Sequence, residues 1–100
     1  MSKFYYKDGT TSAKRDYSRV LHEIEGPAVV FDDDKWWYVD GKLHRIDGPA
    51  MEYGSGTKAW YIDDKYYSEE DFNKFIEEVK QLPLALRLID PREWVRNYGK

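Results

Sequence analysis

The sequence predicts an α+β fold in which tandem antiparallel β-hairpins are capped and packed by C-terminal α-helices. A near repeat in the middle of the chain and a change to helical periodicity near residue 68 both indicate this architecture. Composition agrees, because four Trp, nine Tyr and four Phe supply the bulky side chains that a core needs in a chain of 100 residues. We expect a single domain over 1–100, with a degenerate half repeat at 1–20, hairpin repeats at 21–67 and a helical cap at 68–100.

The near repeat aligns LHEIEGPAVVFDDDKWWYVDGK at 21–42 with LHRIDGPAMEYGSGTKAWYIDDK at 43–65, a period of 22 to 23 residues. Each copy reads as a strand, a turn and a strand, and Asp40-Gly41 suits the positive φ of a tight hairpin turn. One hairpin buries too little surface to be stable alone, so we expect the copies to stack. The equivalent positions are Leu21 and Leu43, His22 and His44, Ile24 and Ile46, Gly26 and Gly48, Ala28 and Ala50, Trp37 and Trp60, Tyr38 and Tyr61, Val39 and Ile62, and Asp40 and Asp63.

The first twenty residues match the repeat only in part. Tyr6-Lys7-Asp8-Gly9-Thr10 resembles Tyr53-Gly54-Ser55-Gly56-Thr57, the turn region of the second copy. Residues 11–20 fit the pattern poorly. The likeness predicts a half copy at the start of the chain.

Alternation along the strands predicts two faces for the stacked hairpins. The expected core face carries Val29, Phe31, Trp37, Val39, Met51, Tyr53, Trp60 and Ile62. The opposite face carries Ala28, Val30, Trp36, Tyr38, Ala50, Glu52, Ala59 and Tyr61, and Glu52 marks it as partly wet. Trp36, Tyr38 and Tyr61 then form an aromatic strip that suits contact with a partner or a planar ligand. Alternatively, the C-terminal helices cover this strip and make it a second core layer.

A helix is expected from Ser68 to about Leu82. Ser68 is an N-cap residue followed by acidic residues, and Tyr67 is placed to pack on Phe72 as a hydrophobic staple. Apolar residues recur at intervals of three and four positions, which gives one stripe to lie on the hairpins. Pro83 interrupts the helix, and Asp90-Pro91 begins a second one. The stripe of the first helix is Phe72, Phe75, Ile76, Val79 and Leu82, and that of the second is Trp94, Val95 and Tyr98.

The repeated LH-x-I-(D/E)-GPA strings resemble the hairpin-repeat proteins of tailed phages, which are relatives of the MORN-type variant repeats. The resemblance covers residues 21–67 and departs from the family pattern at Glu23, where Arg is usual, and at Asp64, where Gly is usual. It implies a MORN-like meander and a phage accessory protein in the cytoplasm of an infected bacterium. The resemblance also implies that the protein acts on a host enzyme or defence factor.

Little in the sequence points to catalysis or to a cofactor. There is no cysteine, so disulfides, thiolate zinc sites and cysteine nucleophiles are excluded, and no serine has the setting of an esterase nucleophile. His22 and His44 recur at one repeat position, and we expect each imidazole to bond a neighbouring backbone group, with Arg45 pairing with Asp47 or Glu25. The acidic run 32–34 and the Gly-rich run 54–56 read as turns, because neither has the ligand spacing of a calcium or phosphate loop.

We therefore expect a non-enzymatic protein without a cofactor that binds an unidentified host bacterial protein. The expected contact residues are Trp36, Tyr38, Tyr61, His44 and Arg45. Two alternatives stay open. One is a protein that sequesters a nucleotide or other small ligand through Arg45, His44 and Tyr rings. The other is nucleic-acid binding through the aromatic strands and a face with Arg87, Arg92 and Arg96, which the net charge of −3 disfavours. The composition includes no membrane span, and the residues leave the oligomeric state and a role within the virion open.

Overall fold

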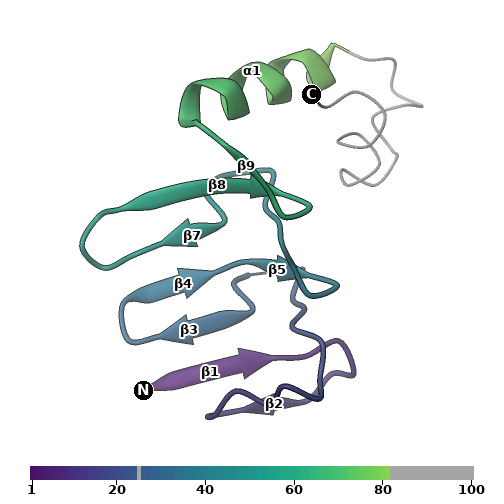
Figure 1. The fold of residues 1–100 in the computed structure, drawn as a ribbon, viewed down its shortest axis with the longest axis vertical. Helices are drawn as coiled ribbons and strands as arrows, with labels where there is room; N and C mark the ends of the chain where they lie inside the picture. Colours follow the sequence, from purple (N-terminus) through teal and green to yellow (C-terminus); the bar gives the residue numbers. More distant parts are fainter. Residues whose placement is uncertain (25, 82–100) are drawn as a thin grey trace.

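The computed structural model describes residues 1–24 and 26–81, which form an antiparallel β-meander followed by one α-helix. Seven strands make a sheet of order β2-β1-β3-β4-β7-β8-β9, and β5 pairs with β6 beside it. Figure 1 shows the hairpins stacked one on another, with α1 across the β8–β9 end. The elements are β1 (Ser2–Tyr5), β2 (Thr11–Ser12), β3 (Val29–Phe31), β4 (Asp34–Trp36), β5 (Tyr38–Val39), β6 (Lys42–Leu43), β7 (Met51–Glu52), β8 (Lys58–Ile62), β9 (Lys65–Tyr67) and α1 (Glu69–Lys80).

The two central hairpins are held by the same local hydrogen bonds. The backbone N–H of Asp40 donates to Nδ1 of His22 at 2.9 Å, and that of Asp63 donates to Nδ1 of His44 at 3.1 Å. Both aspartates have a φ of 52°, which marks the same turn in each copy. The expectation that each imidazole bonds a neighbouring backbone group is confirmed.

The start of the chain occupies the place of a second hairpin strand. The backbone N–H of Tyr5 donates to the carbonyl of Ala28 at 2.8 Å, and Trp37 makes the same bond to Ala50 at 2.8 Å. The backbone N–H of Tyr6 donates to the carbonyl of Thr10 at 3.0 Å, and that of Tyr53 donates to the carbonyl of Thr57 at 2.9 Å. Residues 4–9 thus stack on the first hairpin as that hairpin stacks on the second.

The register of the hairpins overturns the expected division into faces. Val29 lies opposite Trp36, and in the second hairpin Met51 lies opposite Ala59. Directly opposed residues project to the same face, so Val29 shares a face with Trp36 and not with Trp37. The expected core set is therefore wrong in both copies. In each hairpin, the residues expected on the second strand are offset by one position from those that share a face with the first strand. Phe31, expected in the core, is 51% exposed.

The cause of this shift is the number of residues in each turn. The first turn contains only Asp32 and Asp33, since Phe31 pairs with Asp34. A two-residue turn pairs odd-numbered positions with even-numbered ones, and Asp32 adopts the positive φ of 53° that such tight turns require. The Gly54–Thr57 region adds one residue, so Met51 pairs with another odd-numbered position. The glycine-rich run is a turn, as expected, and the acidic run is a turn at Asp32 and Asp33, while Asp34 begins β4.

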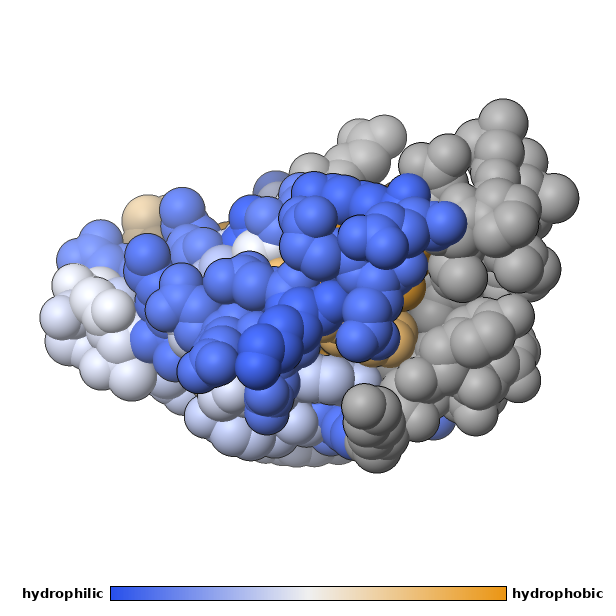
Figure 2. Space-filling model, turned by 90° about the horizontal axis from the view of Figure 1, so that it is seen from above, coloured by the Kyte–Doolittle hydropathy of each residue, from blue (hydrophilic) through white to orange (hydrophobic). Residues whose placement is uncertain are grey.

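Two hydrophobic clusters form the core, one at each end of the described stack. The first contains Tyr6, Leu21 and Val29, with Phe4, Trp36 and Tyr38 packed against it. The second joins α1 to the last strands and contains Ile62, Tyr67, Phe72, Phe75 and Val79, with Ile46, Trp60 and Ile76 packed against it. The helix thus covers the face of Trp60 and Ile62, and its outward surface is hydrophilic (Figure 2).

Helix α1 begins and packs as its sequence predicts. The Ser68 hydroxyl accepts a hydrogen bond from the backbone N–H of Asp71 at 3.1 Å, which confirms the N-cap. Tyr67 shares the buried cluster with Phe72, as expected for a staple. The helix ends at Lys80 with Gln81 as its C-cap. Leu82 and the second expected helix from Asp90 lie outside the described residues, as does Glu25 as a partner for Arg45.

Burial of Tyr38 predicts a loss of stability in alkali. Desolvation raises the pKa of Tyr38, and the charge of Asp64 raises it further. The folded state therefore favours the neutral phenol of Tyr38. The stability that this preference contributes is fully present below the unfolded pKa of about 10, and it is lost as pH rises through the higher folded pKa. Urea unfolding from pH 8 upward should show a steeper fall in stability above pH 10 for the native chain than for Tyr38→Phe. Equal slopes would contradict this assignment.

Candidate functional site

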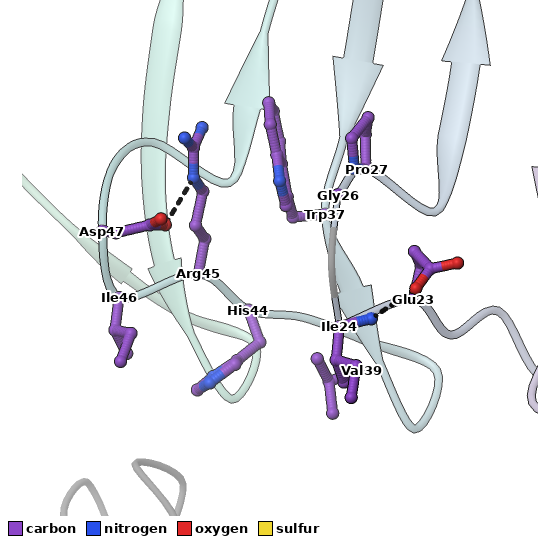
Figure 3. A pocket seen from close by; sticks show the side chains of 10 residues that line it. All are labelled: Glu23, Ile24, Gly26, Pro27, Trp37, Val39, His44, Arg45, Ile46 and Asp47. Atoms are coloured by element: carbon purple, nitrogen blue, oxygen red, sulfur yellow. Dashed lines mark hydrogen bonds and ion pairs between the residues drawn. The ribbon is translucent and has the colours of Figure 1, made fainter.

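A groove of about 750 Å³ opens between the two Leu-His segments (Figure 3). We call it the Ile24 groove. Its residues Trp37 and Val39 are equivalent to Trp60 and Ile62, which pack against α1. Chain segments that carry Glu23 and His44 flank Trp37 and β5 on either side. The backbone N–H of Glu23 donates to the carbonyl of Tyr38 at 3.1 Å, and that of His44 donates to the carbonyl of Trp37 at 3.0 Å. Its lining residues are Glu23, Ile24, Gly26, Pro27, Trp37, Val39, His44, Arg45, Ile46 and Asp47.

Apolar side chains make the floor of the Ile24 groove. Figure 3 shows Ile24 and Val39 side by side, with Ile46 on the far side of His44. Ile24 is 76% exposed, whereas its equivalent Ile46 packs against the α1 cluster. Likewise Val39 is half-buried, whereas its equivalent Ile62 is completely buried. The first hairpin thus leaves open the apolar surface that the second hairpin places under α1.

Arg45 forms one wall of the groove and ties the two hairpins together. Its guanidinium lies over the ring of Trp37, 3.9 Å from the centroid. Nε donates to Asp47 at 2.8 Å, as the sequence led us to expect, and Nη1 donates to Glu52 at 2.9 Å and to the carbonyl of Pro49 at 3.1 Å. With two carboxylates already bound, this cation is neutralised within the protein. A phosphate ligand has to displace them, which weakens the nucleotide alternative.

Gly48 is needed where the Arg45 side chain crosses the backbone. A Cβ at Gly48 would lie 2.9 Å from Cζ of Arg45, whereas a Cβ at the equivalent Gly26 meets nothing within 4 Å. Gly48→Ala should therefore push the guanidinium off Trp37, and we expect it to lower the free energy of unfolding by about 1 kcal/mol. Gly26→Ala should be neutral or slightly stabilising, because it only restricts the unfolded chain. Urea unfolding of both variants checks this, and equal changes would contradict it.

The five expected contact residues lie in two different places. His44 and Arg45 line the Ile24 groove, but His44 is only 8% exposed and its Nδ1 accepts a backbone hydrogen bond. Trp36 and Tyr38 lie on the opposite side of the strand and border a smaller depression of about 300 Å³ with Tyr17 and Phe31. Tyr61 makes an edge contact with Tyr66, with 5.5 Å between ring centroids. The aromatic strip is therefore partly packed against the first core cluster.

Sequence reasoning missed the open floor of the groove. Trp37 and Val39 were expected in a common core, and Ile24 was not among the expected contact residues. The width of a helix is the signal that could have identified these residues as exposed. A helix is about 10 Å across and strands lie about 4.8 Å apart, so one helix covers about two strands. Each hairpin repeats the same apolar pattern, and α1 covers the apolar surface of only one hairpin.

Comparison with protein-family models, curated proteins and solved structures finds no match. Among residues 1–24 and 26–81, no three His, Cys, Asp or Glu side chains gather as a metal site. Within the same part of the chain, no helix combines the length and apolar character needed to cross a membrane. The basic residues Arg87, Arg92 and Arg96 lie outside the described residues.

Proposed function

We propose that this chain is a non-enzymatic protein-binding module and that the Ile24 groove is its contact surface. One observation carries the proposal: Ile24 is 76% exposed beside half-buried Val39 and Trp37, while the equivalent Ile46 is packed under α1. A contiguous apolar surface rimmed by polar groups is typical of a protein interaction site. Trp37 supplies the kind of large, rigid side chain that anchors such interfaces.

The polar groups of the groove support contact in place of catalysis. Nδ1 of His44 is occupied by a backbone N–H, and Arg45 is held by Asp47 and Glu52. A general base or an oxyanion donor has to face the substrate with its polar atom, and these atoms face other parts of the protein. Both side chains therefore shape the walls of the groove.

The resemblance of the LH-x-I-(D/E)-GPA strings to phage hairpin-repeat proteins supplies the biological part of the proposal. We take the stacked hairpins as MORN-like units. The partner is then a host bacterial protein, acting in defence or metabolism, that the chain modulates or inhibits in the host cytoplasm.

Paired variants test whether partner binding depends on the groove. Tagged chain, Ile24→Asp and Tyr17→Asp are used side by side to capture proteins from bacterial lysate, after circular dichroism has confirmed that each is folded. Tyr17 is the matched control, because it is 86% exposed and borders the depression on the opposite side of the strand. We expect a host protein that is lost with Ile24→Asp and kept with Tyr17→Asp. Identical captured sets for Ile24→Asp and the native chain would refute the proposal, and loss with Tyr17→Asp alone would assign binding to the aromatic strip.

A further inference from the structure

We propose that the partner inserts an amphipathic helix with a basic polar face into the Ile24 groove. This inference rests on the proposed function and names the element that binds. The second hairpin provides the precedent within the molecule. There α1 lays Phe72, Phe75 and Val79 against Ile46, Trp60 and Ile62, so one helix occupies the surface equivalent to the groove.

The first hairpin presents an equivalent apolar surface on a similarly bonded backbone. Ile24, Trp37 and Val39 stand at the positions of Ile46, Trp60 and Ile62. Their backbones are fixed by equivalent bonds, since Glu23 donates to Tyr38 at 3.1 Å and Arg45 donates to Tyr61 at 3.1 Å. A surface with the same residue types and backbone favours the same kind of ligand, which is a helix with apolar residues at positions i, i+3 and i+7.

Two differences from the covered surface shape the ligand. Val39 lacks one methylene of Ile62, which leaves more room for a large side chain from the ligand. Arg45 covers one face of Trp37 and closes the groove on the side of the second hairpin. The inserted helix is therefore expected to place a bulky residue beside Val39 and to contact the uncovered parts of Trp37 and Ile24.

Charge distinguishes a basic partner helix from a second copy of this chain. Asp47 lines the groove beside Arg45, and Glu52 pairs with the same guanidinium, so two carboxylates accompany one cation. Helix α1 itself has five acidic and two basic residues, and its apolar stripe is already buried. A second copy would bring like charge to this rim, whereas a helix with Lys or Arg beside its apolar stripe would bring opposite charge.

Synthetic peptides and the full chain test the inference by NMR of isoleucine methyl groups. The first peptide keeps the Phe-x-x-Phe-x-x-x-Val stripe of α1 and carries Lys in place of its acidic residues. The second has the unaltered α1 sequence, and the third is the Lys peptide with both Phe changed to Ser. We expect the Lys peptide to shift the Ile24 methyl saturably, to bind at least about tenfold more tightly than the α1 peptide, and to lose binding in Ile24→Asp. The third peptide should not bind.

The outcomes separate this inference from the proposed function. No shift of Ile24 with the Lys peptide at about 1 mM, or an equal shift with the Ser peptide, would overturn the helix inference. If lysate capture still depended on Ile24, the protein-binding function would stand with another kind of ligand. Concentration-dependent self-association that Ile24→Asp abolishes would instead assign the groove to a second copy, and this too would overturn the inference.

Discussion

Ile62→Ala is expected to lower the free energy of unfolding by about 3 kcal/mol. Ile62 is completely buried at the centre of the cluster that holds α1 to β8 and β9, so the truncation leaves a cavity beneath the helix. For a domain of this size the melting temperature should fall by roughly 15 °C. Urea and thermal unfolding followed by circular dichroism measure both quantities.

The equivalent residue of the first hairpin is the control for Ile62. Val39 is half-buried and lines the open groove, so Val39→Ala should cost about 1 kcal/mol or less. The difference in lost unfolding free energy between the two variants measures how much more α1 buries the second hairpin than the first. Equal losses of stability would mean that the two surfaces are covered to the same extent.

Arg45→Ala should have the next largest effect, a loss of about 2 kcal/mol of unfolding free energy. The substitution removes the cation over Trp37 and leaves the Glu52 carboxylate, which is 34% exposed, without its guanidinium partner. Arg45→Lys should recover only part of this loss. The planar guanidinium of Arg45 stacks on the indole while it bonds both Asp47 and Glu52, and the compact ammonium group of lysine lacks this geometry. Unfolding in urea at fixed salt gives the values.

Asp47→Ala separates the stacking of Arg45 from its exposed ion pair. The Asp47 side chain is 81% exposed, and exposed pairs contribute about 0 to 1 kcal/mol. We therefore expect Asp47→Ala to cost much less than Arg45→Ala. A similar cost for both would show that the ion pair, and not the contact with Trp37 and Glu52, holds the hairpins together.

Features that depend on neighbouring residues were predictable from the sequence. Ser68 caps α1 through Asp71, and the apolar stripe of the helix packs on the hairpins. The repeat placed His22 and His44 in equivalent positions, and both imidazoles accept a backbone N–H from the following turn. The α+β class followed from the same short-range patterns.

The division of the hairpins into faces was not predictable to the same degree, because it depends on the length of each turn. One residue more or less in a turn moves a whole strand to the other face, and the run Asp32-Asp33-Asp34 does not show where the turn ends. Once Val29 is paired with Trp36, Trp37 moves to the side of Ile24. The groove is open because this register places Trp37 beside Ile24 and because α1 covers the second hairpin and not the first.

The most direct test of this account is the solvent exposure of isoleucine methyl groups in the free, full-length chain, measured by NMR with a soluble paramagnetic compound. We predict strong relaxation of the Ile24 methyl, weaker relaxation of Ile46 and almost none for Ile62, in the order of their burial. Equal protection of Ile24 and Ile46 would show that the first hairpin is covered as the second is, and it would contradict an open binding groove.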